Sequence, residues 1–310
     1  MPGQWGPEAK RAAVSVTFDN LGEASDIEFS RWASDRPVGK HHSVHRDLPA
    51  IIDVLGHAKA TFFIEAWNLP VYPSAVHALA EAGHEIGCHG MRHEIWGVLT
   101  ADQELDHIKR CQQDFADHGI ELLGLRPPGG IAAPNSGHVL PAVGLRYISP
   151  FSVPTGVLDS GLAVLECSQA ASDVAFYSPA FTQLRKYKPG PETLSPEDLV
   201  QGVMAEVETS IAVGGFMAIL CHPHLQSPTP ERTDPARIEA IGEIVRRLST
   251  DDRLWFTTCA HAARWMLDHR EEFPPPPSLD PPAWWDPSIY RNIKRPIISS
   301  SGIEEPLRAS

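Results

Sequence analysis

The sequence predicts an α/β protein built around a parallel barrel. Short apolar runs rich in β-forming residues alternate with longer segments of helical periodicity. The alternation recurs in roughly seven or eight strand and helix units, which favours a barrel over an open sheet. The length of 310 residues is compatible with one such barrel. We therefore expect a barrel domain over residues 1–272 and a C-terminal tail over residues 273–310.

Strands are expected where a short β-branched or apolar run stands between polar segments. These runs cover residues 12–18, 60–65, 84–88, 122–126, 146–149, 162–167, 216–221 and 254–258.

Helices are expected between these strands. Thr100 and Gln103 have the spacing of a capping box, and Ser195 with Pro196 at the first helical position and Asp198 behind opens a second long helix. Helical periodicity covers residues 46–58, 73–83, 135–143, 196–213, 238–248 and 259–270.

The chain changes character from about Glu271, where the sequence reads EEFPPPPSLDPPAWWDP. Four consecutive prolines fit neither a helix nor a central strand, so this segment is expected to be extended. Trp284 and Trp285 would be costly to expose to water. We expect them to pack on the barrel or on a neighbouring subunit.

Charge and hydropathy exclude several classes of partner. The net charge of −13, from 26 basic and 39 acidic residues, repels nucleic acid and anionic membrane. No apolar run approaches the length that crosses a bilayer, and the first residues lack the apolar segment of a secretory signal. These observations predict a cytoplasmic protein that acts on a small molecule.

The cysteines predict no disulfide framework. Their number is odd and their spacing contains no CxxC pair. We expect reduced thiols that mostly fill the core, at Cys88, Cys111, Cys167, Cys221 and Cys259.

Polar residues follow five of the expected strands, at the edge where a parallel barrel collects its functional groups. They are Asp19 and Asn20, His89 and His93, Arg126, Asp173, and His222 with His224. The five strand ends therefore direct reactive groups to one rim.

Each of these residues also has a structural interpretation. His89 and His93 are four apart and can bind zinc from one side of a turn, but the spacing also arises by chance in a chain with 15 histidines. Arg126 before PPGG can grip a carboxylate or lie in a solvated turn. Taken alone, His222 is interpreted as a buried core histidine whose hydrogen bonds are formed within the protein. Asp173 taken alone is interpreted as a helix cap or a turn residue.

Three further histidines are expected to lie in a loop. His41, His42 and His45 lie together in GKHHSVHRD, a polar stretch between two expected elements. We interpret them as loop residues, one of which could be a metal ligand.

Taken together, the motifs resemble a known family. TFDN, ATFF, HGMRHE, RPPGG, HPHL and WFTT follow one another as in the NodB-type polysaccharide deacetylases. HGMRHE and HPHL are most similar to the branch that contains metal-independent allantoinases and cyclic imidase-like or peptidoglycan deacetylase-like enzymes. The resemblance extends from about Val14 to Trp265.

The resemblance implies a distorted (β/α) barrel that hydrolyses C–N bonds of amides. By position, Asp19 corresponds to the general base, which Arg126 would orient. His222 corresponds to the general acid on the opposite side of the substrate. His89 and His93 correspond to ligands of a divalent metal, most commonly zinc.

Asn20 departs from the family pattern, because the family has a metal-binding acid at this position. An amide oxygen can coordinate zinc but adds no negative charge, which predicts weaker binding. Alternatively Asp19 itself is the ligand, in which case Glu23, Asp26 or Asp173 would supply the base.

The sequence leaves three hypotheses for function. They are metal-assisted hydrolysis of a small amide, imide or N-acetyl sugar, metal-free hydrolysis as in the allantoinase-like members, and a catalytically inactive barrel that binds a ligand. Trp67, Trp96, Phe151, Phe176 and Tyr177 are candidates to line the substrate pocket or to serve as ordinary packing residues. The resemblance also implies a homo-oligomer, a dimer or a tetramer.

Overall fold

The strands of the computed structural model follow the order expected from the sequence. The structure describes residues 4–33, 35–276, 278–280, 285–286, 297–299 and 302–304. The strands of the main sheet are β1 (Ala12–Asp19), β2 (Thr61–Ile64), β3 (Glu85–Cys88), β4 (Gly124–Leu125), β5 (Tyr147–Ile148), β6 (Gly156–Val157), β7 (Ala163–Val164), β8 (Cys167–Ser172), β9 (Phe216–Cys221) and β10 (Leu254–Phe256). A separate hairpin joins β11 (Ile297–Ser299) to β12 (Gly302–Glu304).

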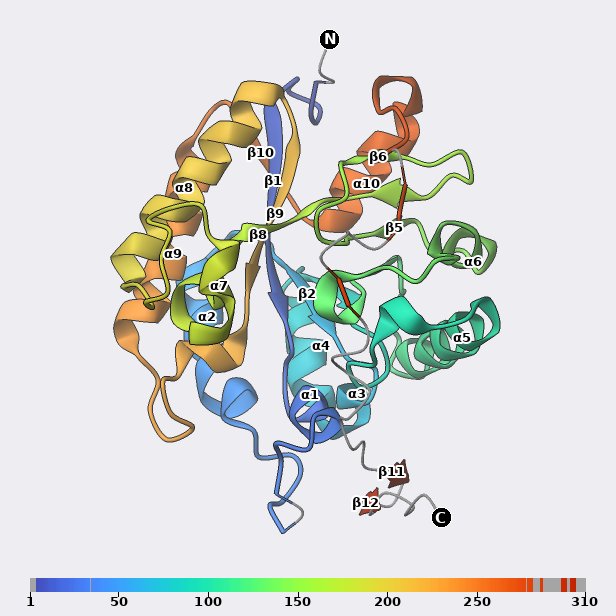
Figure 1. Cartoon of the computed structure of the whole chain (residues 1–310), viewed down its shortest axis with the longest axis vertical. Helices are drawn as coiled ribbons and strands as arrows, with labels where there is room; N and C mark the ends of the chain where they lie inside the picture. Colours follow the sequence, from blue (N-terminus) through green and yellow to red (C-terminus); the bar gives the residue numbers. More distant parts are fainter. Residues whose placement is uncertain are drawn as a thin grey trace.

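The main sheet curls around β1, which pairs with β9 along one edge and with β10 and then β2 along the other (Figure 1). All pairings are parallel except that of β6 with β7, a short antiparallel addition that the sequence did not predict. Cys167 pairs with Ala218 of β9 and forms a parallel bridge with Phe151, which follows β5. The sheet therefore returns on itself, and the expectation of a distorted (β/α) barrel is confirmed.

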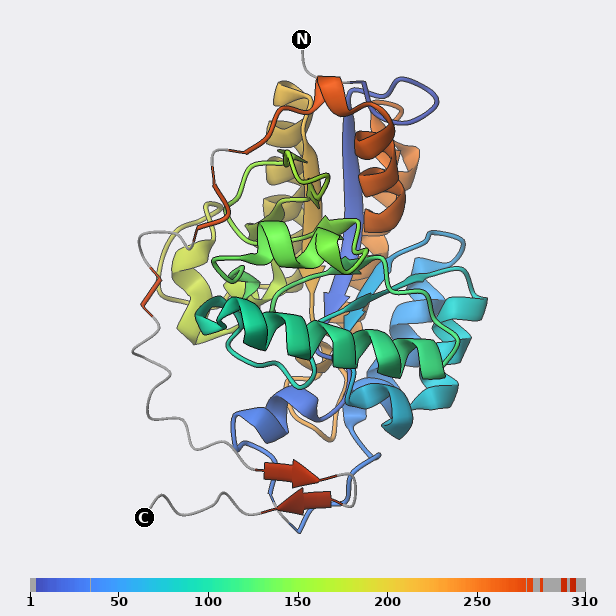
Figure 2. The same cartoon turned by 90° about the vertical axis from the view of Figure 1, so that its right-hand side faces the viewer.

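Helices cover the outside of this sheet. The longer ones are α2 (Leu48–Leu55), α4 (Pro73–Glu81), α5 (Ala101–Asp117), α6 (Ser136–Ala142), α8 (Pro196–Val213), α9 (Pro235–Thr250) and α10 (Cys259–Asp268). Both expected capping boxes are formed, at Thr100 and at Ser195. Helix α5 lies across the front of the view in Figure 2.

Short helical segments follow several strands and shape the loops at the rim. The α-helical ones are α1 (Ala24–Glu28), α3 (Asn68–Val71) and α7 (Asp173–Tyr177). The others are η1 (Ser43–Asp47), η2 (Trp96–Val98), η3 (Pro128–Gly130), η4 (Pro179–Leu184), η5 (Pro223–Gln226) and η6 (Arg270–Glu272). Because they are too short for a sustained periodic pattern, the sequence predicted none of them.

The core has two parts, one on each face of the sheet. One lies between the strands and helices such as α2, α5 and α8, and includes Val14, Val16 and Phe18 of β1. The other lies inside the curl and includes Ala13 and Phe63. Side chains of β1 therefore alternate between the two faces, as the pleat of a strand requires.

The cysteines are buried and unpaired, as expected. Within the described part of the chain, every helix is too short or too polar to cross a bilayer. Of the two tryptophans predicted to pack from the tail, Trp284 lies outside the described residues, whereas Trp285 is partly buried.

Candidate functional site

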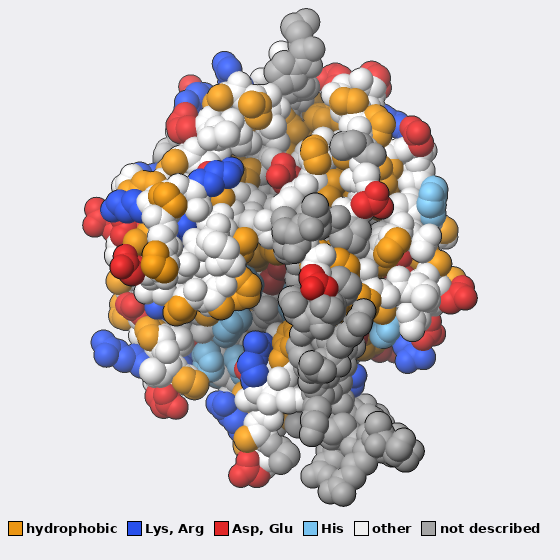
Figure 3. Space-filling model, viewed as in Figure 1, with side chains coloured by type: hydrophobic (Ala, Val, Ile, Leu, Met, Phe, Trp, Pro, Cys, Tyr) orange, Lys and Arg blue, Asp and Glu red, His pale blue; other side chains and the backbone are white. Residues whose placement is uncertain are grey.

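The alternation of side chains decides which residues reach the mouth of the barrel. Residues at odd positions of β1 face the inside of the curl, so Asp19 at its carboxyl end faces inward too. Leu220 of β9 also packs inside, which directs His222 to the same mouth. Figure 3 shows histidine side chains that gather beside a hollow below the centre of this face of the molecule.

Arg126 and Asp19 form a buried ion pair. Arg126 Nη1 donates to Asp19 Oδ1 at 3.0 Å and to Thr17 Oγ1 at 2.6 Å, and Nη2 donates to Ser149 Oγ at 2.9 Å. The guanidinium also lies 4.3 Å from the ring centre of Phe63. Burial raises the pKa of Asp19, and the charge of Arg126 opposes that shift. The arginine therefore fixes one carboxylate oxygen and leaves the other directed at His89.

His89 and His93 face each other at this carboxylate. His89 Nε2 lies 3.8 Å from Asp19 Oδ2, while His89 Nδ1 forms a hydrogen bond with the Arg126 carbonyl oxygen at 2.9 Å. The two imidazoles meet edge to face with centroids 4.9 Å apart. Burial lowers the pKa of His89 to about 3 and that of His93 well below its ordinary value. Both rings are therefore neutral at physiological pH, the form that binds a metal.

Asn20 adopts a left-handed conformation, with φ 61°, which asparagine tolerates better than most residues. No described residue forms a hydrogen bond with its buried Oδ1 or with the buried Nδ1 of His93. Among the described residues, no three His, Cys, Asp or Glu side chains are grouped to hold a metal ion. Asn20 Oδ1 and His93 Nδ1 are therefore buried polar atoms whose hydrogen-bonding capacity is unused, and an amide oxygen and an imidazole nitrogen are both donor types that can coordinate a divalent cation.

His222 has a buried carboxylate partner of its own. Asp173 Oδ1 lies 2.7 Å from His222 Nδ1, and Oδ2 accepts the His222 backbone N–H at 2.7 Å. Gln226 Nε2 also donates to Asp173 Oδ2, at 3.0 Å. Burial disfavours the imidazolium, but the charge and hydrogen bond of Asp173 outweigh it and raise the pKa of His222. Its Nε2 can thus donate a proton while Nδ1 is held by the carboxylate.

The aromatic candidates divide between the rim and the core. Trp96 is fully buried and donates to Glu104 Oε1 at 2.9 Å, so it is a packing residue with no surface for a substrate. Phe176 is likewise fully buried. Tyr177 lies on α7 with Asp173, and no described residue hydrogen-bonds its buried hydroxyl. Phe151 is partly buried against Gly130 of the RPPGG motif.

Trp67 is partly buried and follows β2. Its backbone N–H donates to the Met91 carbonyl at 2.9 Å, which links it to the HGMRHE loop. Trp67 thus remains beside the rim, in contrast to Trp96.

Two of the alternative bases are engaged elsewhere. Glu23 is buried, accepts from the Tyr72 hydroxyl at 2.6 Å and also accepts two backbone N–H groups. Asp26 accepts from Arg31 at 3.0 Å and lies 3.4 Å from His41. Burial raises the pKa of Asp26, yet His41 and Arg31 lower it to about 2. Both carboxylates therefore have structural partners, and Asp173 is committed to His222.

The three histidines expected in a loop are more ordered than the sequence predicted. His41 is buried, and its Nδ1 lies 2.7 Å from Ser43 Oγ. His42 bonds to Asp47 at 2.7 Å, and His45 to the Gly39 carbonyl at 2.9 Å. Polar composition suggested a solvated loop, but local hydrogen bonds satisfy these rings inside the η1 region.

Comparisons with known proteins show which proteins the chain is similar to. Residues 7–148 match the family model of the polysaccharide deacetylases. A peptidoglycan deacetylase-like protein of Gibberella zeae is 28% identical over 213 residues, or 61% of this chain and 57% of that protein. A little under half of the chain, residues 7–148, is therefore similar to the polysaccharide deacetylases.

The polysaccharide deacetylase fold extends over most of the chain. A putative polysaccharide deacetylase from Mycobacterium smegmatis has a TM-score of 0.74 at 22% identity, over 88% of this chain and 96% of that one. An allantoinase has a TM-score of 0.66 at 17% identity, over 86% and 93% of the two chains. At identities this low, the structural similarity shows a shared fold and no more. The chain spans 34% to 57% of the length of the curated relatives that it matches.

The structure also adds a residue to this region that the sequence analysis missed. Glu65 follows β2, is fully buried and accepts from Asn68 Nδ2 at 3.0 Å through Oε2. No described residue hydrogen-bonds its Oε1. Burial, with the negative charge of Asp19, raises the pKa of Glu65 well above its ordinary value. The signal was present in ATFFIE, where an acid ends an apolar strand as Asp19 does.

Proposed function

We propose that this protein is a hydrolase of non-peptide C–N bonds that uses Asp19 as general base and His222 as general acid. The observation that carries the proposal is that each of these groups has its own buried partner. Arg126 holds Asp19 at 3.0 Å, and Asp173 holds His222 at 2.7 Å. Two titratable groups that are fixed separately at one barrel mouth can divide the proton transfers of amide hydrolysis.

In this mechanism, Asp19 removes a proton from the water that attacks the carbonyl carbon. His222 donates its proton to the leaving nitrogen as the C–N bond breaks, which yields an acid and an amine. Because Arg126 and Asp173 fix the two side chains before substrate binds, little reorganisation is needed. Asp173 stabilises the charged imidazolium, and Arg126 keeps Asp19 oriented.

The proposal includes a divalent metal, most commonly zinc, held by His89, His93 and the Oδ1 of Asn20. A bound metal lowers the pKa of water and polarises the carbonyl. The neutral imidazoles and the unbonded Oδ1 support this ligand set. Because the third ligand of this site is uncharged, we expect it to bind the metal more weakly than a site that is completed by a carboxylate.

A second candidate is metal-free hydrolysis, in which Asn20 and the two histidines bind the substrate directly. The neutral character of all three side chains favours it, since each can exchange hydrogen bonds with an amide, imide or ureide. Under this alternative Asp19 and His222 retain their roles.

The substrate class that we propose is a small amide, a cyclic imide or an N-acetyl sugar, with Trp67, Phe151 and Tyr177 near the site. We place the activity in the cytoplasm, for which the five unpaired cysteines are the supporting observation. We also expect a homo-oligomer, which light scattering would test.

The first experiment compares the metal content of the protein purified without added metal with that of Asn20→Asp and Asn20→Ala. We expect substoichiometric zinc in the wild type, near-stoichiometric zinc in Asn20→Asp and none in Asn20→Ala. Equal content in all three would contradict the ligand set. Cyclic imides and small N-acyl compounds are then assayed before and after chelation, with His222→Ala as the inactive control.

The assay also separates the remaining hypotheses. Activity that survives exhaustive chelation supports the metal-free alternative. Full activity in His222→Ala contradicts the acid–base proposal. Binding of a tested compound without turnover by the wild type indicates a ligand-binding barrel.

A further inference from the structure

The described part of the C-terminal tail is attached to the barrel at several points. Phe273 packs against Trp5 with ring centroids 4.8 Å apart, and its carbonyl accepts the Val157 N–H at 3.2 Å. Pro276 is buried, and a Cβ on Gly156 would lie only 3.0 Å from its Cδ. Residues 273–276 of the tail therefore pack on the barrel of the same chain.

Trp285 lies in the same chain beside the HGMRHE loop. A Cβ added to Gly97 would lie 2.9 Å from the indole and 2.6 Å from Ile131. Any larger residue at position 97 would therefore displace the indole or Ile131. The glycine in HEIWG creates the space that Trp285 occupies, four residues beyond His93.

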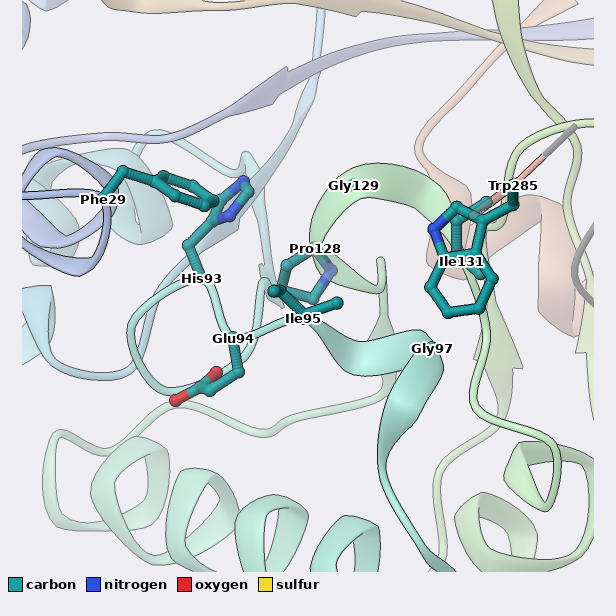
Figure 4. Close-up of a pocket in the computed structure, with 9 residues that line it drawn as sticks. All are labelled: Phe29, His93, Glu94, Ile95, Gly97, Pro128, Gly129, Ile131 and Trp285. Carbon is teal, nitrogen blue, oxygen red and sulfur yellow. The ribbon is translucent and has the colours of Figure 1, made fainter. Parts of the chain in front are cut away.

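The indole forms one wall of a pocket that includes the proposed ligand His93 (Figure 4). Phe29 lies against His93 on the opposite side, with ring centroids 5.3 Å apart. Between the two walls lie Pro128 and Gly129 of the RPPGG motif. The pocket therefore joins a residue of the tail to two of the motifs that place the catalytic groups.

We propose that Trp285 is a specificity-determining residue of this hydrolase. This inference rests on the proposed function. An indole supplies a flat, rigid apolar face against which a small amide, imide or single N-acetyl sugar can pack. Trp285 and Ile131 line this side of the pocket together, so we expect them to obstruct a sugar chain that extends in their direction. The tail thus selects a small substrate over a polymer.

The test uses the full-length protein with succinimide, N-acetylglucosamine and its tetramer as substrates. In Trp285→Ala, we expect kcat/KM for the small substrate to fall about tenfold, mainly through KM, because a packing contact is lost. The ratio of kcat/KM for the tetramer to that for the monomer should rise by about tenfold. Trp285→Phe should recover most of the wild-type ratio, since it keeps an aromatic face.

Leu279→Ala is the matched control, because Leu279 belongs to the tail but packs near Gly137, away from His93. This variant should keep the wild-type ratio. The inference is overturned if Trp285→Ala keeps that ratio, or if Leu279→Ala changes it equally. Failure of the wild type to hydrolyse any of the three compounds would instead count against the proposed function.

A binding measurement tests the pocket independently of turnover. In the 19F spectrum of protein labelled with 5-fluorotryptophan, the signal missing from Trp285→Phe identifies Trp285. Saturating N-acetylglucosamine or succinimide should shift this signal and leave that of Trp265, which stacks on His269 at 3.9 Å, unchanged. A Trp285 signal that neither compound moves would overturn the inference.

Discussion

Asp173 holds His222 at two atoms, because its carboxylate lies 2.7 Å from the imidazole Nδ1 and accepts the backbone N–H of the same residue at 2.7 Å. This double contact connects α7 to the end of β9. It fixes both the position of the ring and the nitrogen that faces the barrel mouth. The clearest tests of the site follow from such buried pairs.

Asp173→Asn should move the alkaline limb of the kcat/KM profile to lower pH. Asp173 raises the pKa of His222, and the general acid acts only while it is protonated. Loss of the Asp173 charge therefore makes His222 deprotonate at a lower pH. At pH 7 we expect a loss of about a hundredfold or more. Gln226→Ala keeps the carboxylate and should leave the limb near its wild-type position. Superimposable profiles for Asp173→Asn and the wild type would refute the proposed role.

Arg126→Ala should lower the free energy of unfolding by about 3 to 5 kcal/mol, because it leaves the Asp19 carboxylate buried without its cation. Urea titration at pH 7 measures the change. Arg253→Ala is the control, since Arg253 pairs with Glu208 and Asp251 at the exposed surface. If both variants lose the same small amount, the buried pair does not stabilise the fold as we expect.

Asn20→Asp should make stability depend on zinc. The left-handed backbone at position 20 accepts aspartate as readily as asparagine, so the change is mainly one of charge. In chelator, an additional carboxylate beside Asp19 should cost about 1 to 3 kcal/mol of unfolding free energy. Zinc should restore it, as thermal melts with and without the metal would show. Asn20→Ala, which offers no oxygen, should not respond, and an Asn20→Asp melt unaffected by zinc would argue against a metal at this position.

Glu65→Gln should stabilise the metal-free protein at neutral pH. The folded-state pKa of Glu65 is raised above its unfolded value, so the wild type loses stability as pH rises above the unfolded pKa, because the unfolded chain ionises this carboxyl more readily than the folded protein does. Glutamine stays neutral, so its urea midpoint should exceed that of the wild type at pH 7 to 8. Below about pH 4 the difference should disappear. Glu231→Gln, at an exposed position, should show no such dependence, and a uniform offset for Glu65→Gln at every pH would exclude ionisation as the cause.

Several parts of the site could be predicted from the sequence because they are local. Asp19, His89, Arg126 and His222 all end or follow strands that periodicity identified, and parallel strands bring their carboxyl ends to one edge. The pairing of Asp173 with His222 was not predictable in the same way. The two residues are 49 positions apart, and the carboxylate reaches the ring only because α7 begins directly after β8.

Trp96 shows where the pattern was insufficient. Trp67 and Trp96 both follow strand ends, but one lies beside the rim and the other is fully buried against Glu104. Which aromatic ring fills the core depends on neighbours that are distant in sequence or on the opposite side of a turn. Periodicity carries no information about such contacts.

The sequence by itself determined the order of the longer helices and of the strands of the main sheet other than β6, the capping boxes of α5 and α8, and the set of polar groups at the barrel mouth. These features depend on contacts between residues a few positions apart and on the alternation of side chains along a strand. Only the tertiary structure decided which of those groups pair, that Glu65 is buried beside them, and that Trp285 lies across from His93. Their free energies come from burial and charge among segments that meet only when the sheet curls.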